Sequence, residues 1–178
     1  MKHLRTFLAT TALCVASAVS AQTLKVYTGQ VAIAFPATAT GDMKYVGSAL
    51  TIGSVTFDLA TVDSITVDRS EIVPASVGVT YDDATGARVT IAADVAPYFV
   101  TKQVVGNHVS LVANNSLTDE VTYTLSGVAT NGSFYMDGEY KSTIALNGVS
   151  LTNPDSAAIC IDNGKRINVV LTDGTSNT

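Results

Sequence analysis

The sequence predicts an all-β protein whose last third begins a parallel β-helix, and three observations lead to this prediction. Short runs of Val, Ile, Thr, Tyr and Phe recur, separated by Gly, Asn and Asp, which is typical of strands and turns. Helical periodicity is nearly absent. From position 107 onward the strand–turn pattern returns roughly every 21–25 residues, the length of one β-solenoid coil.

The start of the chain has the features of a secretory signal peptide. A basic beginning is followed by an apolar run at 7–19 and by small residues before Gln22. We expect cleavage after Ala21 and a protein that is secreted or held at the cell surface. Cys14 allows a lipoprotein alternative, which Leu13 disfavours because a small residue is wanted there. The run is too short to span a membrane, and no later segment is long and apolar enough.

Charge and cysteine content exclude several classes of partner. Cleavage would remove Lys2 and Arg5 and no acid, so 8 basic residues would face 15 acidic ones, a net charge of −7. Such a surface disfavours nucleic acid and anionic membranes. It suits a neutral polysaccharide, or an acidic one bridged by a cation. Cys160 would be the single cysteine of the mature chain, so stability must come from burial and backbone hydrogen bonding rather than from an intrachain disulfide.

Residues 22–105 are expected to form a small antiparallel β unit. Their strand-forming runs are short and rich in β-branched residues, and the segment 82–86 (Asp-Asp-Ala-Thr-Gly) predicts a hairpin turn. The expected strands of this unit lie at 50–52, 55–57, 65–67, 78–81 and 88–91.

The last third of the chain contains a measurable repeat. Leu-Ser-Gly-Val at 125–128 is echoed by Leu-Asn-Gly-Val at 146–149, and Leu171 begins a third copy. A second series interleaves with the first on the same period, because Asp137 is echoed by Asp162. One coil cannot bury its inward face alone, so coils of this kind stack and share a core.

We therefore predict that residues 106–178 are the first coils of a right-handed parallel β-helix; an antiparallel sandwich with chance similarity is the alternative. Turn-forming residues at 172–178 follow the last strand, which favours a truncated helix. Alternation places Cys160 and Tyr135 outward. It places the following side chains inward: Phe134, Met136, Ile144, Leu146, Val149, Leu151, Ile159, Ile161, Ile167, Val169 and Leu171.

A run of linked motifs resembles the start of the carbohydrate-binding β-helix family typified by a cellulosomal clostridial protein. The motifs lie at 123–127, 132–134, 138–140, 143–149, 151–154, 157–159 and 164–167. The resemblance implies a fold similar to that of pectate lyases, a cellulose-like or pectin-like polysaccharide as partner, and calcium in the β-helix. The segments 24–27, 41–43 and 65–68 look like the leader region of surface proteins from Bacteroides-like bacteria, and they carry no chemistry.

Two tyrosines are the candidate sugar-binding residues. Sugar sites commonly use flat aromatic rings beside polar groups, and the sequence contains no Trp. Tyr135 and Tyr140 lie in the coil region. Tyr135 is expected to point outward between inward Phe134 and Met136, so its ring would be available to a sugar. The alternative is a tyrosine that packs on the surface with its hydroxyl in water.

Three acidic residues are the candidate calcium ligands. Calcium requires six to eight oxygen ligands, mainly carboxylates and carbonyls, and Asp137, Glu139 and Asp162 all lie at expected turns. Stacking of the coils should bring Asp137 close to Asp162, where two carboxylates repel each other unless a cation lies between them. The alternative is that Asp precedes Gly here because both residues suit turns.

We expect a secreted carbohydrate-binding protein without catalytic activity. His108 and Cys160 could form a nucleophilic pair only if the fold joined them, and nothing else in the sequence supports that pair. Lys165 and Arg166 beside Asp162 are the one local set that resembles a lyase site, but alternation separates the two bases. A structural or adhesive β-solenoid is the alternative function, and a calcium-dependent polysaccharide lyase is a further one.

Overall fold

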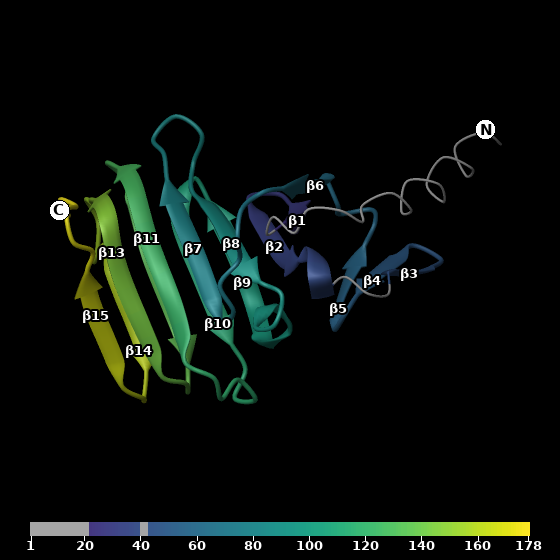
Figure 1. The fold of residues 1–178 in the computed structure, drawn as a ribbon. Coiled ribbons are helices and arrows are strands. Elements are labelled where there is room, and N and C mark those ends of the chain that lie inside the picture. Colours follow the sequence, from purple (N-terminus) through teal and green to yellow (C-terminus); the bar gives the residue numbers. More distant parts are fainter. Residues whose placement is uncertain (1–21, 40–42) are drawn as a thin grey trace.

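The computed structural model describes residues 22–39 and 43–178, and the predicted signal peptide at 1–21 lies outside them. The described part is all-β, as predicted (Figure 1). Two single 3-10 turns, η1 (Ala37–Ala39) and η2 (Ala96–Tyr98), interrupt the strands. In these residues no helix has the length and apolar character needed to cross a bilayer.

The strands of the described part are short, as expected from their β-branched runs separated by turn residues. In chain order they are β1 (Thr23–Thr28), β2 (Val31–Pro36), β3 (Met43–Val46), β4 (Ala49–Ile52), β5 (Val55–Asp58), β6 (Ser64–Asp68), β7 (Ser76–Tyr81), β8 (Arg88–Ala92), β9 (Phe99–Val105), β10 (Asn107–Ala113), β11 (Val121–Ala129), β12 (Gly132–Gly138), β13 (Ser142–Leu151), β14 (Ile159–Asn163) and β15 (Ile167–Leu171).

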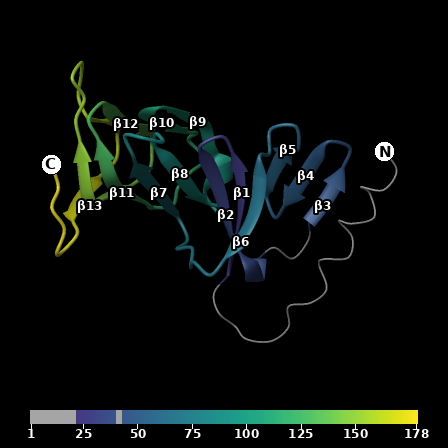
Figure 2. The same ribbon diagram turned by 90° about the horizontal axis from the view of Figure 1, so that it is seen from above.

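These strands form three sheets. The large sheet has the order β15-β13-β11-β7-β8-β2-β1-β6, the second has the order β14-β12-β10-β9, and β3, β4 and β5 form a third. Figure 2 shows the first two as facing layers, with β9, β10 and β12 in one and β7, β8, β11 and β13 in the other. From β11 onward each successive strand belongs to the opposite layer.

The strands of the last third pair in parallel at the repeat steps seen in the sequence. The pairs β11–β13 and β13–β15 are parallel in one layer, and β10–β12 and β12–β14 are parallel in the other. β7, from the first part, also pairs in parallel with β11, but outside this repeat. Leu125 lies beside Leu146, which lies beside Leu171, and Asp137 lies beside Asp162. The predicted repeat is therefore confirmed as a repeat in space.

The first part differs from the expected antiparallel unit in two ways. Its pairs β1–β2, β1–β6, β3–β4, β4–β5 and β7–β8 are antiparallel, but β2 and β8 pair in parallel. The large sheet also continues across residue 105, since β7 pairs with β11. Val77 and Val79 on β7 share one buried face with Tyr123 and Leu125 on β11, so burial of a common core joins the two parts.

The hairpin turn predicted at 82–86 is confirmed between β7 and β8. The Asp82 carboxylate accepts hydrogen bonds from the backbone N–H groups of Ala84 and Thr85, at 2.7 and 3.1 Å. Gly86 follows with a φ of +81°, a conformation that glycine adopts without steric cost.

The core lies between the two layers and contains most of the side chains predicted to point inward. Phe134, Met136 and Ile144 are buried, whereas Val169 and Leu171 are 62% and 65% exposed. For those two residues the predicted inward direction is confirmed, but the side chains are not covered. They pair with Ile144 and Leu146 and so point to the same side, but β15 is an edge strand and no further strand of the described residues covers them.

Replacement of Ser142 by alanine is expected to leave the protein equally stable or to stabilise it. Ser142 is fully buried at the start of β13, and in the described residues its Oγ has no hydrogen-bond partner. A buried hydroxyl without a partner costs free energy, so its removal should raise the free energy of unfolding by up to about 1 kcal/mol. Urea denaturation measures this change, and a loss of more than about 1 kcal/mol would contradict the assignment.

Candidate functional site

The outer face of the second sheet carries three of the five sequence-predicted site residues, Tyr135, Asp137 and Asp162. Side chains alternate between the two faces of a strand. Since Val109, Leu111, Phe134 and Met136 are buried, their neighbours on β10 and β12 point away from the core. We call this surface the Tyr135 face; on β10, β12 and β14 it consists of His108, Ser110, Val112, Ser133, Tyr135, Asp137, Cys160 and Asp162.

Register arranges the Tyr135 face in rows that cross the strands. Tyr135 lies at the centre of one row, between Ser110 on β10 and Cys160 on β14. Asp137 and Asp162 lie side by side in the next row. Because paired strands are about 4.8 Å apart, each row brings side chains from separate coils to one small area.

The opposite end of the face is fixed by a hydrogen bond. His108 Nδ1 and Ser133 Oγ are 2.9 Å apart and join β10 to β12. Neither Ser110 nor Ser133 was predicted to be a site residue. The signal that could have found them is the strand alternation outward from Tyr135 combined with the repeat step, which links His108 with Ser133 and Ser110 with Tyr135.

Tyr135 is half-buried and points outward, as predicted. Desolvation raises the pKa of its hydroxyl, and the nearby charges of Asp137, Asp162 and Cys160 raise it further. The hydroxyl is therefore neutral well above neutral pH, and it can both donate and accept a hydrogen bond. An outward aromatic ring with such a hydroxyl can contact the apolar face and a hydroxyl of a sugar.

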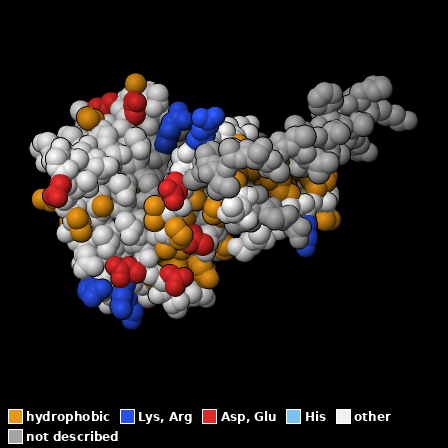
Figure 3. Space-filling model, in the orientation of Figure 1, with side chains coloured by type: hydrophobic (Ala, Val, Ile, Leu, Met, Phe, Trp, Pro, Cys, Tyr) orange, Lys and Arg blue, Asp and Glu red, His pale blue; other side chains and the backbone are white. Residues whose placement is uncertain are grey.

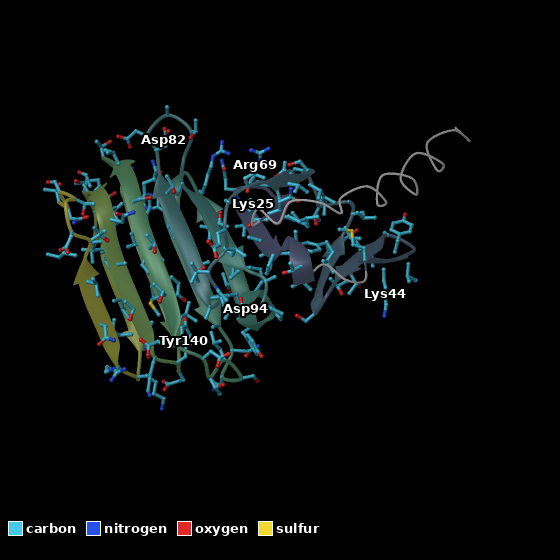
Figure 4. The ribbon with its side chains drawn as sticks, in the orientation of Figure 1. Lys25, Lys44, Arg69, Asp82, Asp94 and Tyr140 are labelled. Atoms are coloured by element: carbon cyan, nitrogen blue, oxygen red, sulfur yellow. The ribbon has the colours of Figure 1, made fainter. Side chains whose placement is uncertain are left out.

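Tyr140 lies in the core, so the structure does not support the prediction that it binds sugar. Its side chain is 2% exposed, and its hydroxyl hydrogen-bonds with that of Tyr123. The residue follows β12 and precedes β13, at the end of the layers where Figure 4 labels it. The physical reason is that the alternation that turns Phe134, Met136 and Gly138 inward also turns Tyr140 inward, and Gly138 leaves room for its ring.

The three predicted calcium ligands are only partly brought together. Asp137 and Asp162 are neighbours, but Glu139 lies beyond the end of β12 and forms an ion pair with Lys165 at 3.6 Å. Across the described ranges, no group of three or more His, Cys, Asp and Glu side chains could hold a metal ion. Two carboxylates alone do not supply the six to eight oxygen ligands of calcium. The donor set therefore does not fit this cation.

The groups considered for catalysis are also separated. His108 is on β10 and Cys160 on β14, and β12 lies between those strands, which puts them roughly 10 Å apart. The two bases beside Asp162 are each paired with an acid, Lys165 with Glu139 and Arg166 with Glu120, both at 3.6 Å. Neither set forms a pair in hydrogen-bond contact.

The outer face of the large sheet offers a different surface. Its strands β7, β11 and β13 present mainly hydroxyl side chains, such as Thr80, Thr122, Thr124 and Thr143. Figure 3 views this layer from outside, where backbone and side chains that are neither hydrophobic nor charged cover most of the area. An aromatic ring for sugar stacking is thus a feature of the Tyr135 face rather than of this part of the large sheet.

Comparison with known proteins gives one family match. A family described as "Carbohydrate-binding domain-containing protein" matches residues 113–178. The match supports a carbohydrate-binding role and a polysaccharide partner, and it includes β12 and β14, which carry Tyr135, Asp137 and Asp162. No curated protein and no solved structure matches the chain.

Proposed function

We propose that this chain is a secreted, non-catalytic polysaccharide-binding protein whose ligand lies on the Tyr135 face. The observation that carries the proposal is the outward, half-buried ring of Tyr135 on a parallel sheet within the residues of the carbohydrate-binding match. Secretion to the medium or to the cell surface rests on the signal-peptide features of 1–21. The likeness of the first part to surface proteins of Bacteroides-like bacteria is consistent with that location.

We also propose that residues 106–178 are the first coils of a right-handed parallel β-helix. Support comes from the strands that alternate between two layers from β11 onward, and from their parallel pairing at the steps of the sequence repeat. Since a β-solenoid presents one strand per coil on each face, a polymer could contact equivalent positions of successive coils. Such a surface suits a linear polysaccharide better than a single sugar.

The proposed contact uses the ring and its polar neighbours. The Tyr135 ring packs against the apolar face of one pyranose, and its hydroxyl, together with Ser110, hydrogen-bonds with sugar hydroxyls. His108 and Ser133 are already joined at 2.9 Å and bound the next position along the strands.

Replacement of Tyr135 by alanine should weaken polysaccharide binding by about thirtyfold, because truncation of a central aromatic contact costs about 2 kcal/mol. Affinity electrophoresis in gels that contain hydroxyethylcellulose measures this loss. Tyr45 on β3 is a matched control, since it is 66% exposed but lies outside residues 113–178; Tyr45→Ala should bind like the unchanged protein. Equal retardation of Tyr135→Ala and the unchanged protein would rule out the Tyr135 face.

Cys160 supplies an independent readout of the same contact. Cys160 is exposed on β14 and lies beside Tyr135 of β12, so bound polysaccharide should slow its alkylation. Mass spectrometry of the proteolytic peptide that contains Cys160 measures this rate. If no polysaccharide in a broad panel binds or protects Cys160, the chain is better explained as a structural or adhesive β-solenoid. Release of unsaturated products from polygalacturonate would overturn the non-catalytic assignment and favour a lyase.

A further inference from the structure

The charges around Tyr135 are of one sign. Asp137 and Asp162 are register partners on adjacent parallel strands, and both lie on the same outer face as Tyr135. No lysine, arginine or histidine of the described residues forms an ion pair with either carboxylate. The two negative charges are therefore uncompensated by a direct contact, and they lie one row from the proposed sugar-binding ring.

The other charged groups near this face do not reverse that sign. At the end of β12, Glu139 is paired with Lys165, so this acid and base largely cancel each other. On β10, His108 contacts Ser133 at the far end of the face. The raised pKa of the Tyr135 hydroxyl, to which both aspartates contribute after desolvation, agrees with a negative local field at the ring.

We propose that Asp137 and Asp162 determine specificity: they repel acidic polysaccharides and restrict the Tyr135 face to neutral, cellulose-like chains. This inference rests on the proposed function and decides between two classes of ligand, neutral and acidic polysaccharides. A uronic acid placed on Tyr135 would bring its carboxylate within reach of two like charges in the neighbouring row, with no described base to compensate. A neutral sugar carries no charge for the two carboxylates to repel.

The size of the effect follows from Coulomb's law. One like charge at about 5 Å in water lowers affinity about fourfold, so two such charges together give at least about tenfold discrimination at low salt. The effect should shrink as salt rises, because at 1 M the Debye length is about 3 Å. Hydrogen bonding to a neutral chain has no comparable salt dependence.

The test uses the double variant Asp137→Asn/Asp162→Asn and two probes, cellohexaose and hexagalacturonate, titrated by calorimetry at low salt in the presence of a chelator. The unchanged protein should bind cellohexaose at least tenfold more tightly than hexagalacturonate. The variant should bind cellohexaose as before and hexagalacturonate about tenfold more tightly. Asp155→Asn/Asp173→Asn removes the same number of charges at exposed turns away from this face and should change neither affinity.

Three results would overturn the inference. Equal binding of both probes by the unchanged protein would remove the specificity while leaving the proposed function intact. An equal gain in affinity for hexagalacturonate in the control variant Asp155→Asn/Asp173→Asn would show that the effect comes from the net charge of the protein and not from the position of the two carboxylates. Tight binding of hexagalacturonate on addition of calcium, lost in Asp137→Asn/Asp162→Asn, would assign the two carboxylates to a cation bridge instead. Binding of neither probe by any variant would, in contrast, contradict the proposed function itself.

Discussion

Replacement of Gly127 by alanine is expected to destabilise the protein by about 4 kcal/mol, enough to unfold many domains of this size. Gly127 lies at a register shift in β11, between its neighbours Tyr81 on β7 and Val149 on β13. Its φ is +86°, a value that other residues rarely adopt. A Cβ there would overlap with the Tyr81 carbonyl oxygen and lie 2.9 Å from the Tyr81 backbone nitrogen.

Alanine variants of two further glycines distinguish the cost of backbone strain from the cost of steric overlap. Gly148 also has a positive φ, +70°, but the nearest atom to its Cβ would be Thr175 Cβ at 3.9 Å, so Gly148→Ala should cost only about 1–2 kcal/mol. Gly78 on β7 has nothing within 4 Å and no positive φ, so Gly78→Ala should change stability by less than about 1 kcal/mol. Urea denaturation of the three variants should give this order, and a Gly127→Ala protein as stable as Gly78→Ala would contradict the geometry.

The same glycines show how far the sequence could predict the fold. The Leu-x-Gly-Val motif at 125–128 and 146–149 predicted that Leu125 stacks on Leu146, which the register confirms, but a register shift then sets Gly127 beside Val149 rather than Gly148. It did not show why position 127 requires glycine, because the reason is a register shift and a close approach to Tyr81, which lies on a strand that the sequence assigned to another unit. The local pattern therefore predicted the repeat, whereas the junction with β7 depends on a long-range contact.

The candidate site was predictable to a similar degree. Strand alternation correctly placed Tyr135 outward and Phe134 and Met136 inward, since it requires only that the strand continue. Continued to Tyr140, the same alternation gives the inward direction that the structure shows, so the sequence could have assigned this residue to the core. The repeat step correctly brought Asp137 to Asp162, but it could not predict that Glu139 would pair with Lys165 instead.

Replacement of Tyr123 or of Tyr140 by phenylalanine should each destabilise the protein by about 2 kcal/mol, while the double replacement should cost much less than the sum. The two hydroxyls hydrogen-bond with each other in the core, where the side chains are 0% and 2% exposed. Burial raises the pKa of both hydroxyls, so they are neutral partners. A single replacement leaves the remaining hydroxyl buried without its partner, and the double replacement removes both polar groups together.

This double-mutant cycle tests whether Tyr140, which was predicted to bind sugar but lies in the core, has a structural role rather than a role in binding. The ring of Tyr123 packs edge-on against Phe134, with centroids 5.4 Å apart, and phenylalanine preserves that contact, so the cycle reports mainly on the hydroxyl pair. Coupling of about 1–2 kcal/mol in urea denaturation, with polysaccharide binding unchanged in all three variants, is the expected result. Additive costs would show that the hydroxyls act independently. A loss of binding in Tyr140→Phe without a loss of stability would return Tyr140 to the ligand site, because a residue that acts only through the core cannot change affinity while the core remains intact.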